Sequence, residues 1–235
     1  MNFSVVIPVY NEEKNISSLI NEIISSMKFY TYEIILVNDA SEDNTKQIIE
    51  DLIKVNKNIF YHQNNVNSGQ SFSIWKGIEL SSYETIITLD GDGQNDPKDI
   101  PNMINIYKNN YKKNTKLVSG IRKKRMDTII KIISSRIANF IRNLILNDKC
   151  KDTGCSLKIF DKKTFLSFPY FDGIHRFIPA FFSAINDKSI YVLVNHRLRK
   201  FGQSKYGTMG RLFRGIRDII KVYFMLKQLK IKNRV

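Results

Sequence analysis

The stretch FSVVIPVYNEE at residues 3–13 decides the fold class, because an apolar run ends abruptly in polar and acidic residues. Residues 3–9 are rich in valine and isoleucine, which is typical of a strand buried in a parallel sheet. From Ile16 to Ile24, isoleucine and leucine recur at helical spacing. A buried strand followed by an amphipathic helix predicts one βα unit of a parallel sheet.

The same unit repeats through the first hundred residues. Further strands are expected at 33–37, 59–62 and 85–89, with helices at 45–53 and 71–80. This rhythm predicts an α/β fold with a doubly wound, mostly parallel sheet flanked by helices. Such sheets bind ligands outside the carboxyl ends of their strands.

The second half of the chain is less regular. Residues 157–160 and 190–194 have the composition of strands, and residues 127–146 and 208–235 have an apolar stripe flanked by Lys and Arg. We expect one compact domain over residues 1–207, followed by a basic amphipathic C-terminal helix, or arm, over residues 208–235.

Charge is distributed unevenly along the 235 residues, which carry a net charge of +15. Residues 1–100 hold 7 Lys and Arg against 15 Asp and Glu, whereas residues 196–235 hold 12 against 1. An acidic front half favours a metal site, and a basic rear favours an anionic partner such as a sugar nucleotide, an anionic lipid or a nucleic acid.

Several classes of protein are excluded or disfavoured. No run of 18 uncharged apolar residues is present, which excludes a spanning helix. Two cysteines are too few for a disulfide framework or a four-ligand zinc site. The first residues lack a positively charged region, so we expect no signal peptide and a cytoplasmic protein.

The segment TLDGDGQNDPKDIP at residues 88–101 is the sharpest candidate for chemistry. Asp90 and Asp92 follow a strand directly, and the glycines beside them let the chain bend so that both carboxylates face a ligand. Together with the amide of Gln94, they are oxygen ligands suited to Mg²⁺ or Mn²⁺ holding a diphosphate. An isolated turn of this composition is equally typical of a polar surface loop.

Three other strand ends carry polar residues. Tyr10 and Glu12 follow the first strand, where they could stack on a base or accept hydrogen bonds, and Asp39 follows the second. Gly69 opens a helix whose free N–H groups could face a ligand. Taken alone, each of these residues is also explained by helix capping or turn geometry.

In this order, the motifs resemble the family 2 glycosyltransferases with a GT-A fold, and most of all their polyprenyl-phosphate (dolichyl-phosphate) mannose or glucose synthase branch. The resemblance covers nearly the whole chain. The strings that carry it are VIPVYNEE at 6–13, VNDASEDNT at 37–45, NSGQS at 67–71, LDGDGQNDP at 89–97, SGIR at 119–122, DTGCSLKIF at 152–160, HRFIPA at 175–180 and RKFGQSKYG at 199–207.

The resemblance implies a role for each matching residue. Asp90, Asp92 and Gln94 would hold Mg²⁺ or Mn²⁺ with the diphosphate, and Asp92, Arg122, Arg199 and Lys205 would be the catalytic residues. The nucleoside would be held by Pro8, Tyr10, Glu12 and Asp39. The remaining expected substrate-binding residues are Gly69, Gln70, Gly91, Ser135, Arg136 and Ser204, of which Ser204 belongs with Arg199 and Lys205 to a basic loop that closes over the diphosphate.

Two departures from the family pattern are visible. This chain reads DGDGQ where members often have DADLQ, which predicts a more flexible turn. Many members also carry C-terminal membrane helices, whereas this sequence ends at Val235 without one.

The expected reaction is inverting transfer of a sugar from a UDP- or GDP-linked donor to a polyprenyl phosphate at the cytoplasmic face of a membrane. A sugar-hydroxyl acceptor in polysaccharide synthesis would require a carboxylate base, for which Asp152 is the only candidate. The expected partners are therefore the sugar nucleotide, the lipid phosphate and the membrane surface, with a separate membrane-protein partner left open.

Two other function classes remain as alternatives. A nucleotidyltransferase would also use paired aspartates, but it should carry a Gly- and Arg-rich loop after its first strand. A nucleic-acid-binding protein fits the basic rear, but no nucleic-acid module is recognisable, so no nucleic-acid partner is expected.

Overall fold

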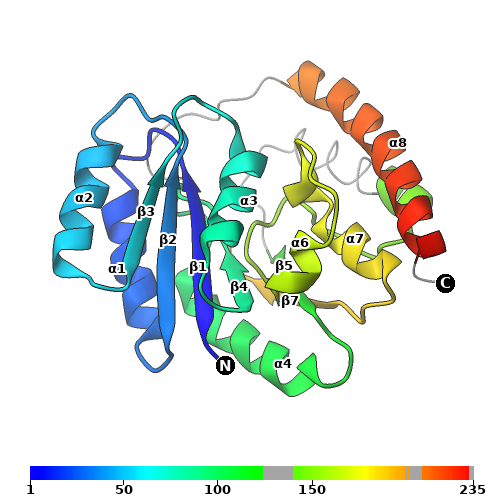
Figure 1. Cartoon of the computed structure of the whole chain (residues 1–235), viewed down its shortest axis with the longest axis horizontal. Coiled ribbons are helices and arrows are strands. Elements are labelled where there is room, and N and C mark those ends of the chain that lie inside the picture. The colour runs from blue at the N-terminus through cyan, green and yellow to red at the C-terminus, as the bar shows by residue number, and fades with distance from the viewer. Residues whose placement is uncertain (124–139, 200, 202–207, 233–235) are drawn as a thin grey trace.

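The computed structural model describes residues 1–123, 140–199, 201 and 208–232. Element labels follow Figure 1. The strands are β1 (Phe3–Val9), β2 (Tyr32–Asn38), β3 (Ile59–Gln63), β4 (Thr85–Thr88), β5 (Leu117–Arg122), β6 (Lys158–Asp161) and β7 (Ile190–Val194).

The helices lie on both faces of the sheet those strands form. They are α1 (Ile16–Met27), α2 (Thr45–Val55), α3 (Gln70–Leu80), α4 (Ile100–Tyr111), α6 (Lys162–Leu166), α7 (Ile178–Ala184) and α8 (Thr208–Lys232), with short 3-10 turns η1 (Pro97–Asp99) and η2 (Ile174–Arg176). Residues 140–146 are also helical.

The sheet confirms the predicted mostly parallel α/β architecture. Its strand order is β3-β2-β1-β4-β6-β5-β7, in which β6 runs antiparallel to both of its neighbours. The other pairs are parallel. The antiparallel β6 places the segment after residue 150 beside β4, the strand that carries the paired aspartates.

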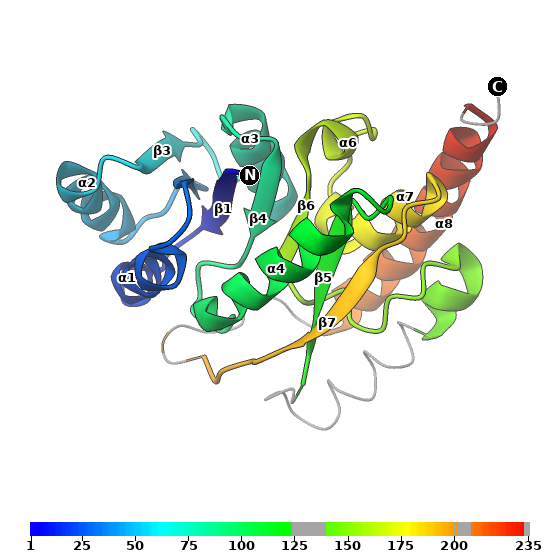
Figure 2. The same ribbon diagram turned by 90° about the horizontal axis from the view of Figure 1, so that it is seen from below.

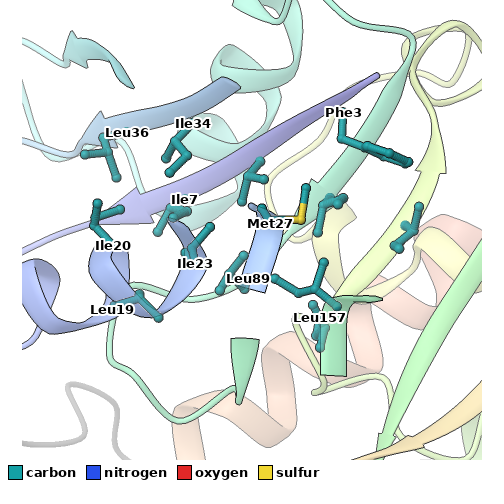
Figure 3. Close-up of a cluster of buried hydrophobic side chains, with 14 of the residues drawn as sticks. Phe3, Ile7, Leu19, Ile20, Ile23, Met27, Ile34, Leu36, Leu89 and Leu157 are labelled. Atoms are coloured by element: carbon teal, nitrogen blue, oxygen red, sulfur yellow. The ribbon is translucent and has the colours of Figure 1, made fainter. Parts of the chain in front are cut away.

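One face of the sheet is covered by α1, α2 and α4, as Figure 2 shows. Figure 3 shows part of this core, in which Ile20 and Ile23 of α1 pack against Ile7 and Leu36 of the sheet. Each fully buried side chain of this kind stabilises the fold by about 1.5–3 kcal/mol, which explains why the apolar spacing in the sequence locates these helices.

The opposite face is covered by α3, α6, α7 and α8. An aromatic cluster fills it, and Phe160, Phe168 and Phe182 make ring contacts at 5.3–6.0 Å between centroids. Val222 and Leu226 pack into the same cluster, so one face of α8 is part of the core. Among the described residues, no helix is long and apolar enough to cross a membrane.

Differences from the sequence-based expectation lie at the element ends and in the second half. Strand β2 runs from Tyr32 to Asn38, one residue beyond the expected range at each end, and β4 ends at Thr88, one residue earlier than expected. Strand β5 and helix α4 were not predicted. The proposed boundary at residue 207 lies outside the described residues.

Candidate active site

The carboxyl ends of the first four strands meet at one edge of the sheet. The register pairs Val9 of β1 with Asn38 of β2 and Asn38 with Gln63 of β3, and it pairs Val6 of β1 with Thr88 of β4. The residues just beyond these ends include Tyr10, Asp39 and Asp90. The sheet therefore brings together the strand ends that the sequence singles out, with Pro8 and Tyr10 half-buried there.

Asp90 is held from two directions. Its carboxylate Oδ1 accepts a hydrogen bond from Gln70 Nε2 at the start of α3, at 2.6 Å. Its backbone N–H donates to Ser156 Oγ at 3.2 Å, and that hydroxyl donates to Asn95 Oδ1 at 2.6 Å. Gln70, which the sequence placed among substrate-binding residues, thus orients the first aspartate of the pair.

The two glycines of the loop have different roles. A Cβ at Gly91 would come within 2.8 Å of Val9 Cγ1, so this glycine lets the loop pack directly against the end of β1. The greater flexibility expected for this turn stays a prediction. Gly93 has a φ of +74°, which favours glycine, and the turn is closed by the Gln94 N–H donating to Asp92 Oδ1 at 3.0 Å.

The electrostatics of this loop fit a divalent cation. The pKa of Asp90 is raised to about 6, because burial disfavours its charge and the carboxylate of Asp92 repels it. A cation between the two carboxylates would remove this repulsion. No cluster of three or more His, Cys, Asp or Glu side chains suited to a metal occurs in the part of the chain that the structure covers. Two carboxylates with substrate phosphates completing the shell are, however, a common arrangement for Mg²⁺.

Asp39 orders the loop that precedes α3. Its Oδ1 accepts from the Ser68 N–H and from Asn64 Nδ2, each at 2.8 Å, and its Oδ2 accepts from the Gly69 N–H at 2.8 Å. The N–H of Gly69, expected to face a ligand, is bound to Asp39 in this structure. Asp39 and Gly69 therefore shape the edge of the site together.

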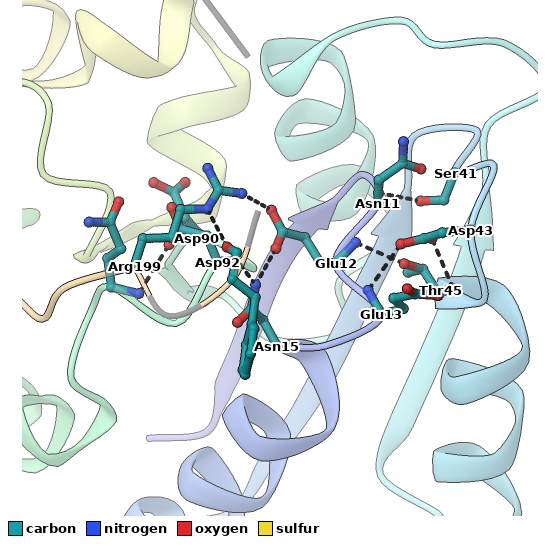
Figure 4. Close-up of polar contacts among 12 residues, drawn as sticks. Asn11, Glu12, Glu13, Asn15, Ser41, Asp43, Thr45, Asp90, Asp92 and Arg199 are labelled. Atoms are coloured by element: carbon teal, nitrogen blue, oxygen red, sulfur yellow. Dashed lines mark hydrogen bonds and ion pairs between the residues drawn. The ribbon is translucent and has the colours of Figure 1, made fainter. Parts of the chain in front are cut away.

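Glu12 and Arg199 contact each other across 187 residues of sequence (Figure 4). Arg199 Nη2 donates to Glu12 Oε1 at 2.6 Å, and Asn15 Nδ2 donates to Glu12 Oε2 at 2.7 Å. Both Glu12 and Arg199 were predicted to contact the donor. In the structure they lie together and pair with one another.

Arg197 fixes this part of the chain to the aspartate loop, a role that sequence reasoning missed. Its guanidinium pairs with Glu22 of α1 at 2.6 Å and with Asp96 at 2.5 Å. Its backbone N–H donates to the Gln94 carbonyl at 2.9 Å, and Gln94 Nε2 donates to the Arg197 carbonyl at 3.3 Å. The amide NH₂ of Gln94, a predicted metal ligand, is thus turned toward Arg197.

Arg122 lies in a fork with Asp152. Arg122 Nε donates to Asp152 Oδ2 and Arg122 Nη2 to Asp152 Oδ1, both at 2.7 Å, and both side chains are largely buried. Because both carboxylate oxygens face the guanidinium, Asp152 is a poor candidate for a general base, and the alternative structural role is favoured.

A chamber of about 760 Å³ opens beside Asp90. We use the term chamber for this cavity alone. It lies between the start of α3, the loop before β6, the turn η2 and one face of α8. Its polar lining residues include Asn67, Ser68, Gln70, Asp90, Ser156, Lys158, Asp172, His175, Arg176, Arg217, Asp218 and Lys221.

His175 is held in the chamber wall as a neutral side chain. Ser71 Oγ accepts from the Gly173 N–H at 2.7 Å and lies 2.7 Å from His175 Nδ1. The pKa of His175 is lowered to about 3, because burial and the nearby Arg176 and Lys158 disfavour its protonation. A general base works best with a pKa near the operating pH, so His175 is a weak candidate for that role.

Four predicted site residues lie outside the described residues. They are Ser135, Arg136, Ser204 and Lys205. The described neighbours of the last two, Arg199 and Phe201, are held to the loop between β1 and α1, since Arg199 pairs with Glu12 and the Phe201 carbonyl accepts from Asn15 Nδ2 at 3.5 Å.

The sequence profile of the glycosyl transferase family 2 matches residues 4–166, which include β1, the aspartate loop and Lys158. The chain belongs to glycosyl transferase family 2. It is 33% identical over 239 residues to the dodecaprenyl-phosphate galacturonate synthase of Rhizobium johnstonii, covering 97% of this chain and 68% of that protein. It is 31% identical over 220 residues to the undecaprenyl-phosphate 4-deoxy-4-formamido-L-arabinose transferase of Yersinia pestis, covering 92% of this chain and 66% of that protein.

Solved structures support the fold of this glycosyltransferase. The glucosyl-3-phosphoglycerate synthase of Mycobacterium tuberculosis superposes with a TM-score of 0.69 at 16% identity, over 96% of this chain and 79% of that one. S. aureus TarS, in complex with UDP-GlcNAc, superposes with a TM-score of 0.63 at 17% identity, over 99% of this chain and 71% of that one. The predicted GT-A fold is confirmed.

Proposed function

We propose that this family 2 glycosyltransferase moves a sugar from a UDP- or GDP-linked donor to the phosphate of a polyprenyl phosphate, with inversion and with Mg²⁺ or Mn²⁺. The observation that carries the proposal is that Asp90, whose carboxylate is repelled by the nearby Asp92, lines a chamber whose other walls bear Lys158, Arg176, Arg217 and Lys221. Both relatives are named as polyprenyl-phosphate sugar enzymes, although this chain spans about two thirds of their length.

The predicted site residues near the aspartate loop would bind the donor and its cation. Asp90 and Asp92, with Gln94, would hold the cation, which supplies positive charge to the departing diphosphate when bound. Glu12 would exchange Arg199 for the donor's hydroxyl or base donors, which frees the Arg199 guanidinium for the phosphates. A glucosyl-3-phosphoglycerate synthase with this fold has been crystallised with Mn²⁺ and UDP, which supports a divalent cation here.

The chemical class of the acceptor is inferred from the carboxylates that could act as a general base. A sugar hydroxyl needs a base to take its proton, whereas a phosphate monoester is already ionised near neutral pH. Asp152 is held by Arg122, Asp218 pairs with Arg176 at 2.7 Å, and Asp172 is exposed. A phosphate acceptor fits these residues best, because it needs no base and is attracted by the basic walls.

The test is a panel of UDP- and GDP-linked sugars assayed for nucleoside diphosphate release, with and without Mn²⁺ or Mg²⁺. A panel is needed because the two relatives carry different sugars in their names. We expect release with one donor class only, dependent on metal and increased by polyprenyl phosphate. Absence of release with every donor in the presence of metal would contradict the proposed activity.

We also propose that the enzyme works at an anionic membrane surface. In helix 140–146, Phe140 is 70% exposed and Leu144 is 77% exposed, so the described part of the predicted apolar stripe is not packed into the core. On α8, Ile220 and Phe224 are exposed although Val222 is buried. Figures 1 and 2 both show the short helix at 140–146, in green, beside α8. Apolar side chains flanked by Lys and Arg are typical of an interfacial helix.

Flotation with vesicles that contain anionic lipid tests this surface. Replacing Leu144 and Phe224 with Asp should lower vesicle binding at least about tenfold, because each removes roughly 1.5–3 kcal/mol of apolar burial. High salt should weaken binding of the unmodified chain as well, since each basic group adds about 1 kcal/mol at low salt. The matched control is Phe29→Asp, because Phe29 is 85% exposed outside both helices. Equal binding by all variants would contradict the proposed surface.

A further inference from the structure

Lys158 is a buried lysine that faces the chamber. It stands at the start of β6, opposite Thr88 at the end of β4, and it is only 2% exposed. The chamber is lined by Lys158 together with Asp90 and Ser156. Lys158 therefore borders the chamber near Asp90 but is almost fully withdrawn from bulk solvent.

The ammonium of Lys158 has few protein partners. Its Nζ donates to the backbone carbonyl of Cys155, and no ion pair within the described ranges includes it. An ammonium has three N–H donors, so a single carbonyl leaves two of them available. Burying an ammonium whose N–H donors are not all used is costly, and Lys158 borders an open space in which a ligand could use them.

Two arginines that are buried or largely buried, Arg122 and Arg142, are paired with carboxylates. Arg122 binds Asp152 through two contacts of 2.7 Å, and Arg142 lies 2.9 Å from Asp148. Lys162 also donates to a backbone carbonyl, that of Ser81, but it lies outside the chamber and is only half-buried. Among these, Lys158 alone is buried, held only by a carbonyl, and open to the chamber.

The loop before β6 positions Lys158 and Asp90 together. The carbonyl of Cys155 accepts from Lys158 Nζ, and the next residue, Ser156, accepts from the Asp90 N–H at 3.2 Å. The loop is tightly packed, because a Cβ at Gly120 would come within 2.7 Å of Cys155 Sγ. Two adjacent residues of one closely packed loop thus hold both the Lys158 ammonium and the Asp90 backbone, and both Lys158 and Asp90 line the chamber.

We infer that Lys158 is a catalytic residue that binds an anionic phosphate oxygen in the chamber. This inference rests on the proposed function. During transfer, the bond from the anomeric carbon to the donor's β-phosphate oxygen breaks, and the electron pair leaves with that oxygen. A bond from the same carbon to an oxygen of the acceptor phosphate forms, and no proton is required. The ammonium of Lys158 neutralises a phosphate oxygen, of the donor or of the acceptor.

The test compares Lys158→Met with the matched control Lys162→Met. Methionine has a similar length but no charge, so folding stability should be unchanged or higher, as when buried charges are replaced by apolar groups. Three kinds of measurement are made on each protein. A thermal melt gives the unfolding temperature, and binding assays with Mg²⁺ give the Kd of inorganic pyrophosphate, of UDP and of GDP. Steady-state kinetics give the kcat and the KM for polyprenyl phosphate. Loss of one charge-assisted hydrogen bond predicts a change of at least about tenfold in one of the binding quantities.

The arms of the experiment distinguish the two phosphates. A tenfold loss of pyrophosphate and nucleotide affinity in Lys158→Met assigns Lys158 to the donor. Unchanged nucleotide affinity with a tenfold rise in KM for polyprenyl phosphate assigns it to the acceptor. Wild-type values in both arms, or a loss of stability that recurs in Lys158→Gln and accounts for the lost activity, would overturn the inference.

Failure of the proposed function gives a different result. Suppose that the unmodified enzyme transfers no sugar but binds pyrophosphate about tenfold more tightly than Lys158→Met does. This result would support an anion site at Lys158 and would contradict the proposed reaction. Lys162→Met should match the unmodified chain in every arm.

Discussion

Asp92→Asn is expected to lose at least about 100-fold in turnover while keeping the unfolding temperature of the unmodified enzyme. The cation that Asp92 would hold supplies several kcal/mol of charge stabilisation to the departing diphosphate, and roughly 2.7 kcal/mol corresponds to 100-fold in rate. Asp92 is half-buried and accepts one described hydrogen bond, from the Gln94 N–H, which an amide oxygen can also accept. The measurement is nucleoside diphosphate release at saturating Mn²⁺, beside a thermal melt.

Asp90→Asn should behave in the same way and serves as an internal check. Its amide oxygen can still accept from Gln70 Nε2, and the repulsion between Asp90 and Asp92 is removed, so stability should not fall. The control is Asp51→Asn, an exposed carboxylate on α2 outside the site. Near-normal turnover by Asp92→Asn with metal present would show that the paired aspartates do not hold the cation.

Arg142→Leu is expected to destabilise the fold by about 3–5 kcal/mol at neutral pH, because it leaves the buried carboxylate of Asp148 without its partner. Arg142 Nη1 lies 2.9 Å from Asp148 Oδ2, and Arg142 Nη2 also donates to the Cys150 carbonyl at 2.6 Å. Both side chains are almost fully buried. This pair joins helix 140–146 to the segment that leads toward the site. Chemical denaturation measures the change in the free energy of unfolding.

The loss of unfolding free energy caused by Arg142→Leu should become smaller as the pH is lowered. Burial raises the pKa of Asp148 even with Arg142 present, and loss of the guanidinium raises it further. The pKa of Asp148 is thus higher in the folded state than in the unfolded state. Such a carboxyl costs no folding stability at a pH below its unfolded pKa, where it is protonated in both states. The cost grows as the pH rises toward the folded pKa. The difference from the unmodified chain should therefore be smaller at pH 5 than at pH 7.5. Lys54→Met, which breaks an exposed pair with Asp51, should change little at either pH. A pH-independent deficit would contradict this explanation.

The first four strands and the residues at their ends could be predicted from sequence, because local signals specify them. Valine and isoleucine runs mark β1 and β2, and polar residues such as Asp39 and Asp90 come within two residues of the end of their strands. Helix α4 also has a local signal, since its buried residues Ile100, Met103, Ile104 and Tyr107 recur at helical spacing.

Contacts between distant segments could not be predicted in the same way. The pairing of Glu12 with Arg199 joins residues at opposite ends of the chain, and nothing local to either residue indicates it. Lys158 occurs in a strand-like string, SLKIF, where the alternation of side chains does not reveal that the strand runs antiparallel beside β4. Its position facing the chamber depends on that tertiary pairing.

The fate of a radiolabelled sugar tests the proposed acceptor most directly. The enzyme is incubated with its donor and divalent metal, together with either polyprenyl phosphate or the matching polyprenol, and the lipid phase is extracted. We predict that label enters the lipid phase only with polyprenyl phosphate, because the described walls of the site offer basic side chains for a phosphate, whereas the buried carboxylates Asp152 and Asp218 are engaged by arginines. Label transferred equally to the polyprenol, or donor turnover without any labelled lipid, would contradict the account.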